Sequence, residues 1–222
     1  IEGAALASAI AYTYGGIAIT VKLWKHADIS PKGQSFKPDK TILIPCVRVA
    51  FPNMCQRFAT SLGYVVFASM INSLGETSAA AHTIANTVES GFYIPGWGMQ
   101  RAIIPLETGL MTVCGALLFA FAPQLMTLFS RDAEVIRLGS TVLRMVAISE
   151  PFYGIPIVLE GMMQGVGKTV APFIFSVIGM WGVRIIGTFI CTQLLGMGLI
   201  AAWACMIAHN VLLFVLFAVY FA

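Results

Sequence analysis

Apolar residues of this chain are gathered into long stretches that short polar, glycine-containing or proline-containing segments separate. The stretches cover residues 3–21, 41–74, 79–93, 103–129, 138–163, 171–194 and 199–222. A transmembrane helix needs about 20 predominantly apolar residues, so most of these stretches are long enough to cross a bilayer. The pattern therefore predicts an all-α protein, a polytopic transmembrane bundle of about seven helices.

The second and the fifth stretch each contain two prolines that bear on their course, since proline removes a helical hydrogen bond and clashes with the preceding turn. In the second stretch, Pro45 and Pro52 predict an interfacial lead-in, with the crossing itself beginning near residue 51. In the fifth stretch, Pro151 and Pro156 predict a helix that is interrupted twice.

The composition agrees with a membrane protein. Apolar residues make up 58% of the chain and charged residues 10%, whereas soluble domains carry about 25% charged residues. Five lysines surround the polar segment 24–40, which is too short for a nucleic-acid-binding domain: Lys22, Lys25, Lys32, Lys37 and Lys40. By the positive-inside rule this segment is expected to be a cytoplasmic loop. The five cysteines form no CxxC pair, which favours packing over disulfides or a metal site.

The strongest candidate for function is Glu150, because it precedes Pro151 near the middle of an apolar stretch. A lone ionised carboxylate at that depth costs about 2.5–3.5 kcal/mol on insertion scales, unless a proton or a cation neutralises it. Broken helices with ionisable groups near mid-depth are typical of secondary transporters. We expect Glu150 to couple an ion or to contact substrate; the alternative is a structural ion pair with Arg184 or Arg144.

Three further residues are candidates for the same site. Glu89 lies near the middle of the third stretch among polar neighbours, and it either lines the cavity or packs within the bundle. Tyr153 is expected to line a cavity. Arg184 lies at comparable depth in the sixth stretch, and we expect a structural role with a carboxylate or helix-terminal carbonyls as its partner.

Catalysis finds no support in the sequence. No Ser/His/Asp or Cys/His arrangement can be argued, and His82 and His209 are isolated in apolar stretches. The segment 165–169 (GVGKT) resembles a phosphate-binding loop, but Met162 occupies the position where that motif needs its first glycine. We therefore expect neither an enzyme nor a cofactor or metal site.

Several segments together resemble one transporter family. They are residues 3–7 (GAALA), 79–82 (AAAH), 91–100 (GFYIPGWGMQ), 148–152 (ISEPF), 159–169 (LEGMMQGVGKT) and 181–185 (WGVRI). This set is similar to the multidrug and toxic compound extrusion (MATE) transporters. The resemblance implies a twelve-helix fold of two six-helix lobes that exports drugs or amphipathic organic cations by alternating access, against inward Na⁺ or H⁺ flow.

The resemblance also implies a domain organisation. Residues 1–23 would be the last helix of the first lobe, residues 24–40 the cytoplasmic interlobe loop, and residues 41–222 the second lobe. The chain is then expected to be a fragment in a bacterial plasma membrane. Its partners would be the lipid bilayer, the first lobe of the same protein and small organic cations, without nucleic acid.

The chain departs from the family pattern in two places. About 20 residues that members usually carry are absent after Gln100, and residues 55–61 lack a carboxylate that some members have there. A further carboxylate of those members would fall near Tyr153. Their sodium site therefore does not transfer residue by residue. Two alternatives stay open: a lipid-linked sugar flippase, which would need a more basic cavity than Arg184 alone supplies, and a non-transporting, degenerate membrane fragment.

Overall fold

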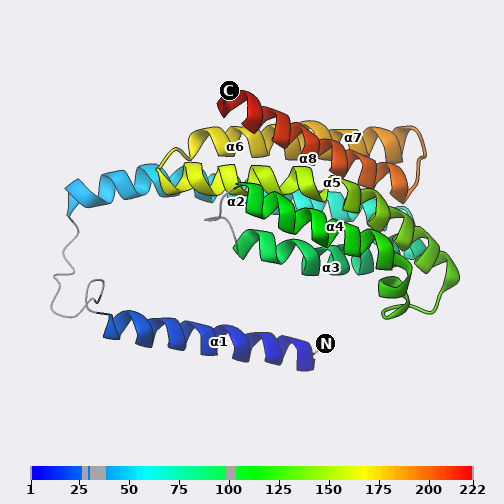
Figure 1. The fold of residues 1–222 in the computed structure, drawn as a ribbon, viewed down its shortest axis with the longest axis horizontal. Helices are drawn as coiled ribbons and strands as arrows, with labels where there is room; N and C mark the ends of the chain where they lie inside the picture. Colours follow the sequence, from blue (N-terminus) through cyan, green and yellow to red (C-terminus); the bar gives the residue numbers. More distant parts are fainter. Residues whose placement is uncertain (1, 27–29, 31–38, 99–103, 222) are drawn as a thin grey trace. The chain divides into compact units, whose positions relative to one another are not determined.

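The computed structural model describes residues 2–26, 30, 39–98 and 104–221, and Figure 1 shows their arrangement. Its elements are α1 (Glu2–Lys25), α2 (Lys40–Asn72), α3 (Glu76–Gly98), α4 (Ile104–Thr127), α5 (Ala133–Gly165), α6 (Val170–Val177), the π-helical η1 (Ile178–Ile185), α7 (Ile186–Phe189), the π-helical η2 (Ile190–Leu194) and α8 (Leu199–Phe221). The run from α6 to η2 is continuous, so the described residues form seven helices. The predicted all-α fold with about seven helices is confirmed.

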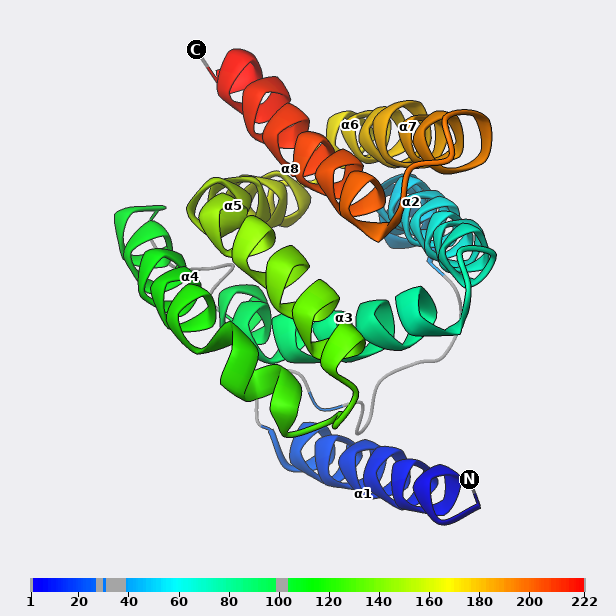
Figure 2. The ribbon, with the colours of Figure 1, turned by 90° about the vertical axis from the view of Figure 1, so that its right-hand side faces the viewer.

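The chain divides into two compact units, residues 1–44 and residues 45–222. The first unit holds α1 and the beginning of α2. In the second unit α5 is the central helix, because it packs against α3, α4, α6 and α8 (Figure 2). The core of this bundle is formed by fully buried apolar side chains such as Phe67, Leu143 and Trp203.

Four helices of the described part are long and apolar enough to cross a membrane: Pro105–Thr127, Ala133–Gly165, Val170–Leu194 and Leu199–Phe221. Many large apolar side chains point outward from them, among them Val113 and Phe121 of α4, Ile148 of α5 and Val215 of α8. Exposed apolar surface of this extent is unfavourable in water but is the normal boundary with lipid. The bundle therefore has the surface of a membrane protein.

The two interruptions predicted at Pro151 and Pro156 are wrong, whereas the interfacial lead-in predicted at Pro45 and Pro52 stays a prediction. Pro45 and Pro52 lie inside the single helix α2, and Pro151 and Pro156 lie inside α5, each helix running for 33 residues. At 1.5 Å per residue such a helix is about 50 Å long, whereas the hydrocarbon core measures about 30 Å. Each helix must therefore tilt or extend beyond the hydrocarbon.

Packing between α4 and α5 shows how α5 accommodates Pro151. Because Pro151 has no N–H, the carbonyl oxygen of Ala147 lacks its usual helical donor. Gly115 of α4 faces this oxygen so closely that a Cβ placed on Gly115 would lie 2.6 Å from it. Gly154 makes a similar approach to Met111. Small residues that let helix backbones approach closely are typical of membrane bundles.

Some of the connections between helices are turns at the glycines where the sequence predicts them. Gly75, Gly167 and Gly196 adopt positive φ at three of the predicted turns. The loop expected over residues 130–137 is shorter, because Asp132 caps α5 by accepting from the backbone N–H groups of Glu134 and Val135. Most of the lysine-rich loop and the junction at Gln100 lie outside the described residues.

Asp39 begins α2, since its carboxylate accepts from the hydroxyl of Thr41 at 2.7 Å and from the amide of Thr41 at 2.8 Å. These bonds hold the pKa of Asp39 below its ordinary value of 3.8. A lowered pKa means that the capping contribution is complete above the ordinary value and is lost as the pH falls through the folded-state pKa. We therefore expect acid below about pH 4 to loosen the first turn of α2.

Amide hydrogen exchange at Thr41 measures this loosening. The Asp39→Asn variant keeps an acceptor but does not titrate, so its protection relative to a reference helix should not depend on pH. Equal pH dependence in both proteins would contradict the prediction.

Candidate functional site

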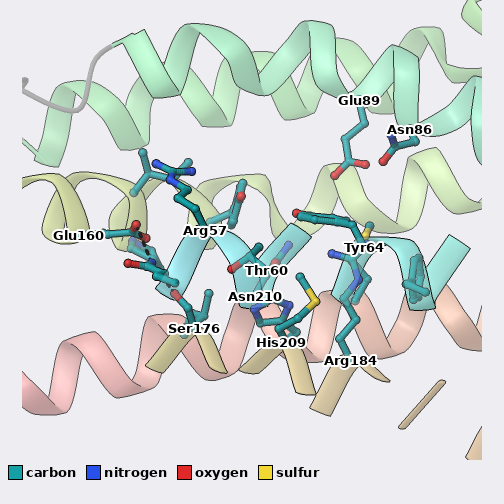
Figure 3. A pocket seen from close by; sticks show the side chains of 18 of the residues that line it. Arg57, Thr60, Tyr64, Asn86, Glu89, Glu160, Ser176, Arg184, His209 and Asn210 are labelled. Carbon is teal, nitrogen blue, oxygen red and sulfur yellow. Dashed lines mark hydrogen bonds between the residues drawn. The ribbon is translucent and has the colours of Figure 1, made fainter. Parts of the chain in front are cut away.

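A cavity of about 480 Å³ lies inside the bundle between α2, α3, α5, α6, η1 and α8 (Figure 3). Its lining combines apolar and aromatic side chains with a set of polar ones: Gln56, Arg57, Thr60, Tyr64, His82, Asn86, Glu89, Tyr153, Glu160, Ser176, Arg184, His209 and Asn210. Side chains from six segments, spread over more than 150 positions of the sequence, meet around this space. Small-molecule sites combine apolar walls with convergent polar groups, and this cavity has both, with polar residues in the majority.

Three of the four candidates from the sequence line this cavity: Glu89 from α3, Tyr153 from α5 and Arg184 from η1. The side chain of Glu89 points from α3 toward the space above Tyr64 (Figure 3). The residue is 6% exposed, so its carboxylate faces the cavity rather than bulk solvent. The structure thus brings the acidic side chain of Glu89 and the basic side chain of Arg184 to one cavity, although their helices are distant in the sequence.

Arg184 is 3% exposed and lies against two aromatic rings. Its Cζ is 4.2 Å from the centroid of Phe67 and 4.8 Å from that of Tyr64. Within the described residues, no carboxylate oxygen forms an ion pair with this guanidinium, and Glu89 acts on it only over a longer distance. The rings occupy the place where the sequence led us to expect a carboxylate or carbonyl partner.

The backbone around Arg184 is π-helical, a feature that no pattern in the sequence predicted. π-helical turns widen the helix by one residue and are frequent at functional sites. Here η1 presents Arg184 to the cavity while Gly179, one turn earlier, lets His209 of α8 approach closely.

Glu150 does not line the cavity but is buried beside it, with 2% of its surface exposed. It lies at the contact of α5 with α4, where its Cβ is next to Gly115. Its Oε2 has no hydrogen-bond partner among the described residues, and the charge of Glu89 is within electrostatic reach. Glu89 thus lies on the cavity wall, and Glu150 is buried outside the lining.

A hydrogen-bonded network at the other end of the cavity was missed from the sequence. The Nε2 group of Gln56 donates to Glu160 at 3.0 Å and to Ser176 at 2.8 Å, and Gln164 donates to the same Glu160 oxygen at 2.8 Å. The network joins α2, α5 and α6. Gln56 and Ser176 are 120 positions apart, and no local pattern pairs them.

A buried acid of α4 was also missed from the sequence. Glu107 of α4 is fully buried, and neither of its carboxyl oxygens has a hydrogen-bond partner in the part of the chain that the structure describes. It lies next to Gly154 of α5. The only available signal was a charge at the beginning of an apolar stretch, which is common at helix ends.

Comparison with known proteins identifies relatives of this architecture. The MatE family model matches residues 100–190. The Thermotoga maritima protein named "Probable multidrug resistance protein NorM" is 24% identical over 94% of this chain and 50% of its own length. The multidrug export protein MepA of Staphylococcus saprophyticus is 23% identical over 95% of this chain and 51% of its own length. The chain thus spans about half the length of these curated relatives.

Solved structures share the fold. A crystal structure of MATE in complex with MaL6 superposes with a TM-score of 0.84 at 18% identity, covering 98% of this chain and 55% of that chain. Together with the apolar membrane spans, these matches show that the chain is a multi-pass membrane protein that is similar in sequence and fold to the MATE transporters.

Proposed function

We propose that the chain is the second lobe, with the last helix of the first, of an exporter that moves drugs or other amphipathic organic cations out of a bacterial cell. The observation that carries this proposal is the cavity, which joins an apolar, aromatic wall to the buried carboxylate of Glu89. Its volume of about 480 Å³ lies within the range of roughly 300–1,000 Å³ typical of drug-sized ligands. The names of the relatives NorM and MepA support drug export.

The proposed mechanism is alternating access between the two lobes. A Na⁺ ion or a proton at Glu89 and Glu150 would bias the rocking of the lobes, and substrate would leave toward the outside. Because binding sites of such transporters lie at repeat interfaces, this lobe alone is not expected to transport. In this scheme residues 1–23 belong to the first lobe, residues 24–40 form the cytoplasmic loop, and no cofactor or catalytic step is needed.

The polar lining does not favour the sugar flippase alternative. That function would need a strongly basic cavity, whereas the lining balances Arg57 and Arg184 against Glu89 and Glu160. Mixed charge suits an organic cation better than a highly anionic headgroup.

Ethidium efflux tests the proposal. We expect a drug-sensitive bacterial host to extrude ethidium when the chain is expressed together with a first lobe, and not when either half is expressed alone. Correct membrane insertion of both parts is checked first, by protease protection. Absence of efflux from the inserted, two-lobe protein would contradict the proposal and favour a degenerate fragment. Loss of surface polysaccharide on deletion of the gene would instead favour the flippase.

A further inference from the structure

The described residues provide Arg184 with neither an ion-pair partner nor an acceptor for its Nε–H. It is 3% exposed, its Nε has no hydrogen-bond partner, and no carboxylate of the described residues pairs with it. Isolated charges are rarely buried in proteins, because removal from water costs several kcal/mol per ion. A buried arginine that opens onto a cavity and has no described carboxylate at ion-pair distance is therefore suited to an anion that arrives with a ligand.

Polar side chains that line the cavity near Arg184 also have nitrogen atoms without a hydrogen-bond partner among the described residues. His82 and His209 line the same end of the cavity, and each has a buried Nδ1 without a partner in the described part of the chain. The side chain of Asn210 adds an amide beside His209 (Figure 3). The acid at the far end, Glu160, already accepts from two glutamines, so it does not compensate these groups.

The aromatic rings hold the guanidinium in a fixed position. Phe67 and Tyr64 contact Arg184 through their faces, at 4.2 and 4.8 Å from its Cζ. Such contacts stabilise a cation but leave the edge of the guanidinium plane, where its N–H groups point, free to donate. A planar donor fork that is fixed in advance is well matched to a carboxylate or a phosphate, which accept two parallel hydrogen bonds.

We propose that Arg184 binds the acidic group, a carboxylate or a phosphate, of an amphipathic substrate that also carries a cationic centre. The inference rests on the proposed export function and specifies its substrate class as zwitterionic amphiphiles. Glu89 enters the cavity from α3, on another wall, and supplies the negative group for the cationic centre. The cavity then holds one charged group for each end of the ligand.

A pair of dyes tests the subsite directly. Rhodamine B carries a xanthylium cation and a carboxylate, and its ethyl ester is the same dye without the acid. Binding is measured by fluorescence anisotropy to the purified two-lobe protein in a neutral detergent. Charge-assisted hydrogen bonds of this kind correspond to about tenfold or more in affinity, so we expect Arg184→Met to weaken rhodamine B by that factor and to leave the ester unchanged.

Arg144 provides the matched control. Its Cζ also lies over an aromatic ring, 5.7 Å from the centroid of Phe119, but it does not line the cavity. Arg144→Met should keep the wild-type ratio of the two affinities. Arg184→Lys keeps the charge without the planar fork and should lose part of the preference. If Arg184→Met lacks the thermal unfolding transition of the wild type and is therefore not folded, Arg184→Lys replaces it in the binding measurement.

The outcomes separate the inference from the function on which it rests. An equal affinity ratio in wild type and Arg184 variants would overturn the subsite, even if ethidium efflux is intact. An Arg184-dependent ratio supports the subsite, even if the protein exports nothing. Competition by dioctanoyl phosphatidylcholine, which carries a phosphate and a cationic centre, then identifies the acid: displacement of rhodamine B that requires Arg184 indicates a lipid phosphate, and retention of rhodamine B indicates a carboxylate compound.

Discussion

Replacing Glu150 by Gln is expected to lower ion-driven efflux by about tenfold or more, while the protein folds and still binds substrate. The glutamine has nearly the same shape, so the contact with Gly115 of α4 is retained. It cannot exchange a proton or neutralise a cation, however, and Glu150 has an Oε2 without a partner among the described residues and 2% exposure. A buried carboxyl in this position interacts with its surroundings very differently before and after it takes up an ion. The measurement is dye flux into proteoliposomes under an imposed Na⁺ or proton gradient.

Glu134→Gln is the control for this experiment, since Glu134 is on the same helix but is exposed and paired with Arg137 at 2.9 Å. An exposed ion pair contributes little, so this variant should transport like the wild type. Undiminished and still ion-dependent flux in Glu150→Gln would remove Glu150 from the coupling step. Loss of flux in Glu89→Gln alone would then assign coupling to the carboxylate on the cavity wall.

The hydrophobic pattern was sufficient to predict the helices, because apolar stretches near the thickness of a bilayer have few other structures available. It was not sufficient to predict whether the prolines interrupt the helices. Whether Pro151 interrupts a helix depends on the neighbouring helix, and here Gly115 of α4 meets the Ala147 carbonyl that Pro151 leaves without its helical donor. That contact joins positions 32 residues apart, and no pattern within α5 reveals it.

The candidate site was predicted as individual residues rather than as a cavity. Depth in an apolar stretch pointed to Glu89, Glu150 and Arg184, since an ionisable side chain in that environment needs a reason to be there. Which of them face one space depends on helix rotation and packing, so Glu150 was expected in the cavity and lies behind its wall. The aromatic partners of Arg184 come from α2, more than 110 positions earlier.

Replacing Gly115 by Ala is expected to destabilise the bundle by about 1–3 kcal/mol, the usual range for overpacking a well-packed contact. The new Cβ would lie 2.6 Å from the carbonyl oxygen of Ala147 and 3.3 Å from Cβ of Glu150. The first of these distances is far below a van der Waals contact, and the obstacle is backbone, which cannot rotate away. Helix α4 must therefore move away from α5, which changes the contact beside Glu150. Thermal and denaturant unfolding in detergent measure the loss.

Gly109→Ala is the control, because it separates the loss of the Gly115 contact from the general effect of replacing a helical glycine by alanine. Gly109 is on the same helix, α4, but a Cβ placed there would meet no atom within 4 Å. Alanine is favoured over glycine in a helix by about 0.5–1 kcal/mol, so this variant should be neutral or more stable than the wild type. Opposite signs for the two substitutions would show that α4 and α5 are in backbone contact at Gly115. The same sign and size for both would mean that the helices are further apart than 2.6 Å implies, and that Pro151 is accommodated in some other way.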